Sequence, residues 1–270
     1  MSETESDVTA RLLVSEAADE RSAPKNVGLG QAVVGTISAP EREGPNEDAA
    51  LILPLGAERG VIAVADGAGS YPQGNVASRV ALEALAAAVD AKPDHLRSAV
   101  LDGFEAAEEA VRGLGTGAAT TLVVVALEGQ RARIFHCGDS MALLCGQKGK
   151  QKHETIAHSP TGYAQAAGML SETGAFRHRD RHLVCHLVGM GDLTITIGPV
   201  LELAARDTIV LGSDGLWDNA YVAEVVEHAR AGPLDESRDA LLAAAREHML
   251  NEPAPIGKPD DLTLILYRPL

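Results

Sequence analysis

The sequence predicts an α+β protein built as a four-layer α-β-β-α sandwich, in which two antiparallel β-sheets are flanked by helix pairs. Two observations predict this class. Segments typical of strands follow one another in series, and segments with helical periodicity occur in neighbouring pairs. A doubly wound sheet would instead alternate one strand with one helix. Because 46% of the 270 residues are hydrophobic, the chain can bury a sizeable core.

The predicted strands are short runs of branched or alternating apolar residues bounded by turn residues. Between residues 119 and 145, the turns Glu128-Gly129-Gln130 and Gly138-Asp139-Ser140 predict a meander of hairpins. The full set of predicted strands covers residues 31–38, 49–55, 60–65, 119–127, 131–137, 141–145, 182–188, 193–197, 208–212 and 262–267.

The predicted helices form two pairs. Residues 74–89 carry apolar side chains at helical spacing, and Pro93 opens a second helical stretch that extends to residue 112. The second pair covers residues 221–230 and 235–250. We expect each pair to pack on one sheet.

Residues 1–28 are polar, acidic and rich in Ser, Glu and Ala, which predicts a mobile tail. Residues 29–270 then form a single domain. Within that domain, residues 147–180 are the least regular part, with mixed polarity and several glycines.

Composition narrows the classes of partner and compartment. The formal net charge of −15 argues against binding to nucleic acid or to anionic membranes. The longest apolar run, residues 122–127, is too short to cross a bilayer, and the first residues lack the features of a secretory signal. The cysteines, Cys137, Cys145 and Cys185, lack the spacing of a disulfide framework. We therefore expect a cytoplasmic protein.

Acidic residues stand at predicted strand ends in several distant parts of the chain. The apolar run 61–65 ends in Asp66 and then Gly67, which places a carboxylate at the rim of the core. Similarly placed acids are Glu47, Asp48, Asp139, Asp214, Asp260 and Asp261. Oxygen ligands without paired His or Cys suit Mg²⁺ or Mn²⁺ and not Zn²⁺. The pattern predicts a hard-cation cluster, provided that the fold brings these strand ends together.

Six short motifs also follow one another in a recognisable order. They are Asn46-Glu47-Asp48, Val64-Ala65-Asp66-Gly67, the Gly/Thr-rich run 115–121, Gly138-Asp139-Ser140, the Ser-Asp-Gly-Leu-Trp-Asp run 213–218, and Asp260-Asp261-Leu262-Thr263. In this order the sequence resembles the metal-dependent protein phosphatases of bacterial type, the type 2C serine/threonine class. The resemblance extends from about residue 31 to residue 268.

The resemblance implies hydrolysis of phosphoserine and phosphothreonine in proteins by a water that two Mn²⁺ or Mg²⁺ ions activate. It implies that Asp66 bridges both ions with the Gly67 carbonyl as a neighbouring ligand, and that Asp214 and Asp260 complete the ligand set of one ion. Glu47 and Asp48 would act through bound waters, with Asp48 helping to orient the nucleophile. Asp139 would lie just behind the ligands.

Three departures from the family pattern matter. The family's phosphate-binding Arg position holds Glu43, and Arg42 lies one residue earlier with Pro45 inserted in the loop; we expect Arg42 to reach the phosphate all the same. Ala68 replaces a His or Met, which implies that no side-chain acid serves the leaving group and favours leaving groups of low pKa.

The third departure is Ala157 at the start of a flap, where many bacterial relatives carry an Asp that binds a third metal. We expect that third site to be weak or absent unless Asp180 or Asp139 compensates. The resemblance places the flap at about residues 147–180, beside the active site. His158, which follows Ala157, is a candidate to contact the substrate or to stabilise the flap.

Two other patterns have simpler interpretations. His178, His182 and His186 are spaced as ligands on one helical face, but residues 182–188 read as a strand, which favours packing over metal binding. Cys137 is followed by Gly138 and Asp139, whose charge disfavours a reactive thiolate, so we expect a core residue.

The expected partner is a phosphorylated protein, the target of a bacterial-type serine/threonine kinase, and the expected state is a monomer. Since a phosphopeptide would be repelled by most of this acidic surface, cations must offset the repulsion at the mouth of the site. Two alternatives are a catalytically weak relative that serves as a regulatory binding module, and a metal phosphatase of a small phosphorylated molecule.

Overall fold

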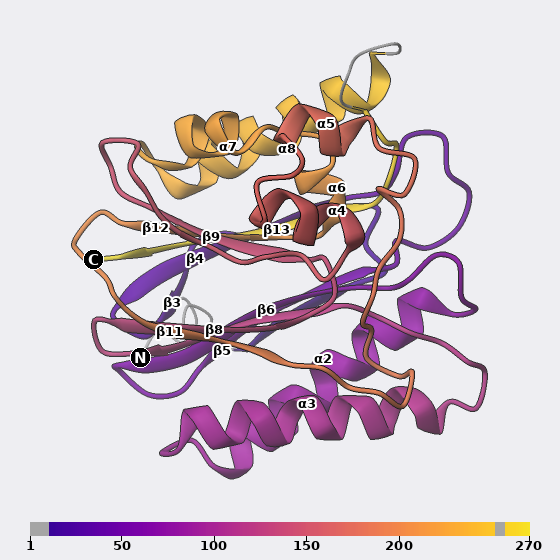
Figure 1. Cartoon of the computed structure of the whole chain (residues 1–270). Coiled ribbons are helices and arrows are strands. Elements are labelled where there is room, and N and C mark those ends of the chain that lie inside the picture. Colours follow the sequence, from indigo (N-terminus) through magenta and orange to yellow (C-terminus); the bar gives the residue numbers. More distant parts are fainter. Residues whose placement is uncertain (1–10, 252–256) are drawn as a thin grey trace.

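The computed structural model describes residues 11–251 and 257–270, and it shows the predicted four layers (Figure 1). Within these residues, each strand pair of the two central sheets is antiparallel. The first sheet has the order β1 (Leu12–Ser15), β5 (Asp48–Pro54), β6 (Arg59–Asp66), β7 (Leu122–Glu128), β8 (Arg131–Cys137) and β11 (Thr196–Glu202). The second has the order β10 (Gln151–Glu154), β9 (Met141–Cys145), β12 (Thr208–Gly212), β13 (Leu262–Pro269), β4 (Gly30–Ile37) and β2 (Asp19–Arg21), with β3 (Lys25–Val27) also paired to β4.

Helices cover the outer face of each sheet. The pair α2 (Gly74–Ala91) and α3 (Leu96–Gly113) lies below the first sheet in Figure 1, and α7 (Val222–Ala229) and α8 (Leu234–Leu250) lie above the second, beside the short α6 (Asp214–Trp217). Two further short helices, α4 (Pro160–Ala166) and α5 (Glu172–Phe176), belong to the segment between β10 and β11. In the described part of the chain, none of the helices has both the length and the hydrophobicity to span a bilayer.

The continuous apolar runs are explained by burial of the strands on both faces. Along β5, Leu51 packs toward the α2/α3 layer, whereas Ile52 belongs to the core between the two sheets. The same alternation holds in β6, where Ala63 and Ile62 face opposite ways. Because both faces are covered, neither needs polar residues, and the strand pattern is apolar throughout.

The prediction of a mobile tail over residues 1–28 is wrong for its second half. Strand β1 pairs with β5, and β2 and β3 pair with β4. Val14 and Val27 are buried in the core between the sheets. The segment escaped prediction because its strands are very short and β2, Asp19–Arg21, is polar and exposed, so that no apolar pattern marks it and its backbone pairing defines it as a strand. Residues 1–10 lie outside the described residues.

The predicted strand at residues 182–188 is also wrong. This stretch crosses the ends of the strands instead of lying beside one, and within it only Val188 forms a β-bridge, to Thr120. The irregular region 147–180 contains β10, which belongs to the second sheet, and then the helices α4 and α5.

Candidate metal centre

The first sheet places Asp66 and Asp48 side by side. They are opposite partners on the antiparallel strands β6 and β5. Thr120 and Thr121 fix the end of β6, because both donate to the Asp66 carbonyl at 2.8 Å, Thr120 through its hydroxyl and Thr121 through its amide. The Asp66 amide in turn donates to the Thr121 hydroxyl at 3.0 Å. The Gly/Thr-rich motif before β7 is therefore a support for the Asp66 backbone.

Gly67 is required by a close approach of two backbones. A Cβ at this position would lie 2.3 Å from the carbonyl oxygen of Gly74, the first residue of α2. The Gly67 amide donates to the Glu47 carbonyl at 3.0 Å. This contact joins the turn after β6 to the chain that enters β5.

The second sheet supplies Asp214, which directly follows Ser213 at the end of β12 and begins α6. Gly215 allows this turn to pack against the strand entry at β13, since a Cβ there would lie 2.0 Å from the Asp261 carbonyl oxygen. The Ser213 hydroxyl donates to Asp48 Oδ2 at 2.7 Å and accepts from the Thr263 amide at 3.0 Å. Ser213 thus links the two sheets at the site.

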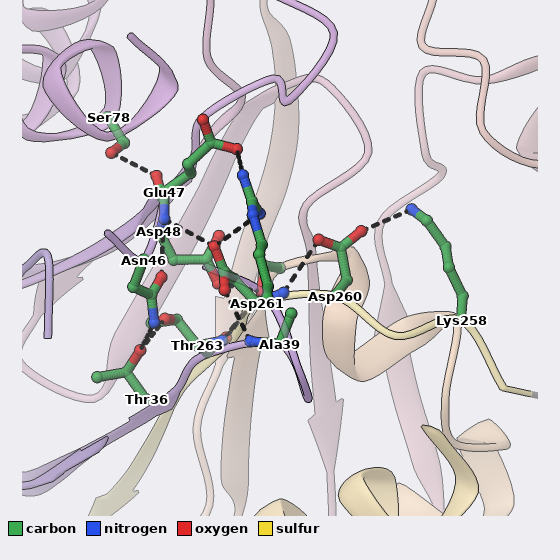
Figure 2. A network of polar contacts seen from close by, with 12 residues as sticks. Thr36, Ala39, Asn46, Glu47, Asp48, Ser78, Lys258, Asp260, Asp261 and Thr263 are labelled. Atoms are coloured by element: carbon green, nitrogen blue, oxygen red, sulfur yellow. Dashed lines mark hydrogen bonds and ion pairs between the residues drawn. The ribbon is translucent and has the colours of Figure 1, made fainter. Parts of the chain in front are cut away.

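The buried carboxylate of Asp261 organises the loop that carries Arg42 (Figure 2). Asp261 accepts from the amides of Ala39 and Glu47, each at 2.8 Å, and from Arg42 Nη1 at 3.0 Å. The other Arg42 nitrogen, Nη2, pairs with Glu47. The one-residue insertion at Pro45 therefore does not remove Arg42 from the site.

Acidic residues from both sheets line one cavity of about 230 Å³. Four of them, Asp66, Asp139, Asp214 and Asp260, come from the ends of β6, β8, β12 and the entry to β13, and Arg42, Glu47, Gly67, His182 and Lys258 also line it. Asp48 is not part of the lining, because it is 3% exposed and lies behind Asp66 and Ser213. The structure brings the predicted strand ends together around the cavity, with Asp48 buried behind its lining.

A residue with no role in the sequence analysis, Lys258, lies among these carboxylates. Its Nζ is 3.0 Å from Asp260 Oδ2 and 3.5 Å from Asp218 Oδ2, and it also pairs with Asp214. Asn219 holds the Lys258 backbone, accepting from its amide at 2.7 Å and donating to its carbonyl at 2.9 Å. No sequence signal marks this role, because it depends on contacts across 40 residues of chain.

The carboxylates of the cavity carry an excess of negative charge. Burial, reinforced by Asp214 and Asp218, raises the pKa of Asp139 to about 8. Burial, with a contribution from Asp214, also raises the pKa of Asp260 to about 6. The pKa of Asp66 is raised well above its usual value, by burial first and then by Asp48 and the other acids. Burial by itself would lower the pKa of Lys258, yet its acidic neighbours raise it overall.

These residues fit a pair of hard divalent ions. The donors are carboxylate oxygens, which Mg²⁺ and Mn²⁺ prefer, and they have more negative charge than Lys258 and Arg42 can balance. Two of these acids, Asp214 and Asp260, already share a single cation, the Lys258 ammonium, with the nearby Asp218. Among the described residues, no three acidic, His or Cys side chains already enclose a point as a closed metal cage.

His158 is a wrong candidate for substrate contact. It is 3% exposed and does not line the cavity. Its Nδ1 accepts from the Gly138 amide at 3.2 Å, and its Nε2 bonds to the Thr196 hydroxyl at 2.8 Å. The ring also stacks near His136, with centroids 4.4 Å apart. His158 instead ties the flap to the strand end that carries Asp139, which is the second role considered for it.

Cys137 is a core residue. Its side chain is fully buried in the cluster between the first sheet and the α2/α3 layer. Burial raises the pKa of its thiol to about 12, so that the thiolate needed by a nucleophile is scarce at neutral pH.

The structure has two antiparallel sheets between helix layers and aspartates from both sheets around one cavity. This arrangement is that of the type 2C phosphatase fold. The sequence profile described as Protein phosphatase 2C matches residues 38–249. The chain belongs to this family.

Relatives and solved structures agree with this assignment. The chain is 30% identical to protein phosphatase PhpP of Streptococcus pneumoniae over 206 residues, which covers 70% of this chain and 80% of PhpP. The crystal structure of the PPM Ser-Thr phosphatase MsPP from Mycobacterium smegmatis is 26% identical, with a TM-score of 0.75 and coverage of 90% of this chain and 99% of MsPP. Serine/threonine phosphatase Stp1 from Staphylococcus aureus, at 20% identity, shares the fold with a TM-score of 0.76, over 92% of this chain and 98% of Stp1.

Proposed function

We propose that this protein hydrolyses phosphoserine and phosphothreonine in proteins and uses two Mn²⁺ or Mg²⁺ ions to do so. The observation that carries the proposal is the convergence of Asp66, Asp214 and Asp260 on one cavity whose rim holds Arg42. Support comes from the relatives, since PhpP is a protein phosphatase and PstP of Mycobacterium tuberculosis is a serine/threonine protein phosphatase. The catalytic domain of PstP, which is 24% identical and has a TM-score of 0.70, has been solved in complex with two manganese ions.

Asp66 would hold both ions because it stands at the end of β6 on the first sheet, facing Asp214 and Asp260 from the second. The Gly67 carbonyl is the adjacent backbone oxygen. Two divalent ions, when bound, supply an activated water and neutralise charge that develops on the phosphoryl oxygens. The protein's part is to keep these oxygen ligands fixed, which the Thr120-Thr121 support does for Asp66.

Arg42 is the group proposed to bind the phosphate. Its guanidinium lines the cavity and is oriented by Asp261 on one side and Glu47 on the other. A planar guanidinium matches the oxygens of a phosphoryl group with two parallel hydrogen bonds. Glu47, which lines the same cavity, and Asp48, which lies behind the lining and is held by Ser213, would help to orient solvent near the phosphate.

We further propose that two ions suffice and that a third is bound weakly or not at all. Asp139, Asp214 and Asp218 approach one another, but the Lys258 ammonium already pairs with Asp214 and Asp218. The flap contributes Ala157, and its Asp180 is engaged with His178 and Arg179 instead.

The test is hydrolysis of p-nitrophenyl phosphate and of a phosphothreonine peptide in the presence of Mn²⁺. We expect activity that a chelator abolishes and Mn²⁺ restores, and that Asp66→Asn lowers by at least a hundredfold, in line with the several kcal/mol that metal ions supply. Asp94→Asn is the matched control and should retain full activity, because Asp94 is a surface acid in the turn between α2 and α3 that pairs with Arg59, at the opposite end of β6 from Asp66. If neither ion supports activity, the protein would be a regulatory binding module and not a phosphatase. Activity on p-nitrophenyl phosphate alone would indicate a phosphatase of small molecules.

A further inference from the structure

The chain that leads away from the metal cavity at His182 includes a basic segment in an otherwise acidic protein. Residues 177–182, which we call the basic segment, read Arg-His-Arg-Asp-Arg-His. Three arginines against one aspartate give it a formal charge of +2 with the histidines neutral, whereas the whole chain carries −15. Such a contrast makes this segment a local exception in a chain whose net charge would repel an acidic substrate.

The basic segment is held in a defined position at the site. Arg181 donates to the Phe176 carbonyl at 2.7 Å and to the Gly257 carbonyl at 3.4 Å. Its side chain lines a small second cavity, of about 80 Å³, together with Asp139 and Asp214. Arg181 is therefore engaged with the protein itself, and it fixes the segment against the loop that carries Lys258.

The chain that follows is anchored at successive points as it crosses the end of the sandwich (Figure 1). The Cys185 amide donates to the His158 carbonyl at 2.7 Å, and Val188 and Thr120 form a β-bridge. The amides of Gly189 and Gly191 then donate to the Glu108 carboxylate of α3 at 2.5 and 2.6 Å. The chain from the basic segment to Gly191 is thus held at both ends and is not a free loop.

The basic segment runs from the cavity outward. His182, at its end, lines the metal cavity beside Asp66 and Asp260. Arg179 projects away from the protein with its side chain 90% exposed, and its ion-pair partner is Asp180 at 3.5 Å. Arg177 is exposed, and within the described residues its guanidinium has no hydrogen-bond or ion-pair partner. Arg177 therefore has no partner among the described residues, and Arg179 pairs only with its sequence neighbour Asp180, so that both exposed guanidinium groups are accessible to a ligand.

We propose that Arg177 and Arg179 bind acidic side chains that flank the phosphorylated residue of the substrate protein. The inference rests on the proposed function, because it takes the phosphate to occupy the metal cavity. From His182 to Arg177 the chain spans five residues, at most about 18 Å. The recognised acids consequently lie within about five positions of the phosphorylated residue. Acidic flanks would otherwise be repelled by the surrounding surface, so the basic segment makes acidic phosphorylation sites the preferred substrates.

The test compares three phosphothreonine peptides of equal length whose flanking residues are acidic, neutral or basic. The variant Arg177→Glu/Arg179→Glu reverses the charge of the two exposed arginines, and Arg177→Gln/Arg179→Gln removes it. Arg97→Glu, an exposed arginine on α3, is the matched control. Catalysis is measured as kcat/KM with Mn²⁺, with p-nitrophenyl phosphate as a substrate that has no flanks. Binding of the same peptides is measured by fluorescence anisotropy in the Asp66→Asn background, which needs no turnover.

We expect the wild type to prefer the acidic peptide, and the Glu variant to lose about tenfold in kcat/KM and in affinity for it, with the Gln variant between them. The neutral peptide should change less than about twofold, p-nitrophenyl phosphate should not change, and added salt should reduce the preference. Equal loss on every substrate would show a merely structural role, and unchanged selectivity would show that the arginines do not recognise flanks; either result overturns the proposal. A wild type that binds acidic peptides selectively but hydrolyses nothing would instead contradict the proposed function.

Discussion

Lys258 offers the most informative single substitution, because it places one fixed positive charge among carboxylates that would hold the divalent ions. Its Nζ contacts Asp214, Asp218 and Asp260. An ion that takes Asp214 and Asp260 as ligands must share them with this ammonium or displace it. Lys258→Met keeps the length of the stem and removes the charge, so it should strengthen Mn²⁺ binding.

The size of the effect follows from the contacts. A pair of unit charges about 4 Å apart is worth about 4 kcal/mol at an effective dielectric constant of about 20. The side chains of Lys258 and Asp260 are 24% and 29% exposed, so solvent screens part of this interaction. A coupling of about 1–3 kcal/mol between the ammonium and the ion remains, which corresponds to about 5–150-fold in affinity.

Isothermal titration of the metal-free protein with Mn²⁺ at fixed pH measures this directly, without any need for activity. Lys152→Met is the matched control, since Lys152 forms a half-buried pair with Asp207 at 2.6 Å away from the cavity. We expect Lys258→Met to bind Mn²⁺ at least fivefold more tightly and Lys152→Met to bind it as the wild type does. Equal or weaker binding by Lys258→Met would refute the reasoning that the ammonium and the ions compete for the same oxygens.

Three further predictions follow from the same geometry. Burial and neighbouring acids raise the pKa of Asp139 to about 8 and that of Asp218 to about 7. Between about pH 4 and pH 8 these groups bind more protons in the folded metal-free protein than in the unfolded chain, so the melting temperature should fall as the pH rises. A melting temperature that does not change with pH would contradict this. Saturating Mn²⁺ should remove the fall. Ser213→Ala removes the hydroxyl that bonds buried Asp48 and the backbone of β13. It should lower the free energy of unfolding, measured in urea, by about 2–4 kcal/mol. A loss under about 0.5 kcal/mol would show that Ser213 does not stabilise the contact between the two sheets. Burial raises the pKa of the Cys137 thiol to about 12, so iodoacetamide should not inactivate the enzyme at pH 7.5, and inactivation that Cys137→Ala prevents would show the opposite.

The fold could be predicted because strands that are buried on both faces are apolar throughout. Strands such as β6 are continuous apolar runs, and the paired helices keep their apolar periodicity over about five turns. Strand β2 has no such apolar pattern, since its three residues are polar and exposed and it joins the sheet through its backbone. The strand prediction for residues 182–188 failed because the side chains alternate as in a strand, whereas the stretch is held by isolated backbone hydrogen bonds and one β-bridge and does not pair along a neighbouring strand.

The sequence predicted those site residues that lie in recognisable local sequence patterns and missed the others. Asp66 and Asp214 were found because a carboxylate that ends a buried strand is costly without a partner. Lys258 and Ser213 were missed, since their roles arise only when β12, β13 and the loop at Asn219 meet. Of the two roles considered for His158, its burial against His136 rules out contact with the substrate and leaves stabilisation of the flap; the sequence gives no measure of such burial.

Anomalous diffraction from crystals soaked in MnCl₂ tests most directly whether this cavity is a dinuclear site. We expect two manganese peaks in the cavity, both within bonding distance of the Asp66 carboxylate, with Asp214 and Asp260 ligating one of the ions. Peaks only at the protein surface, or a fully occupied crystal with none beside Asp66, would contradict the assignment.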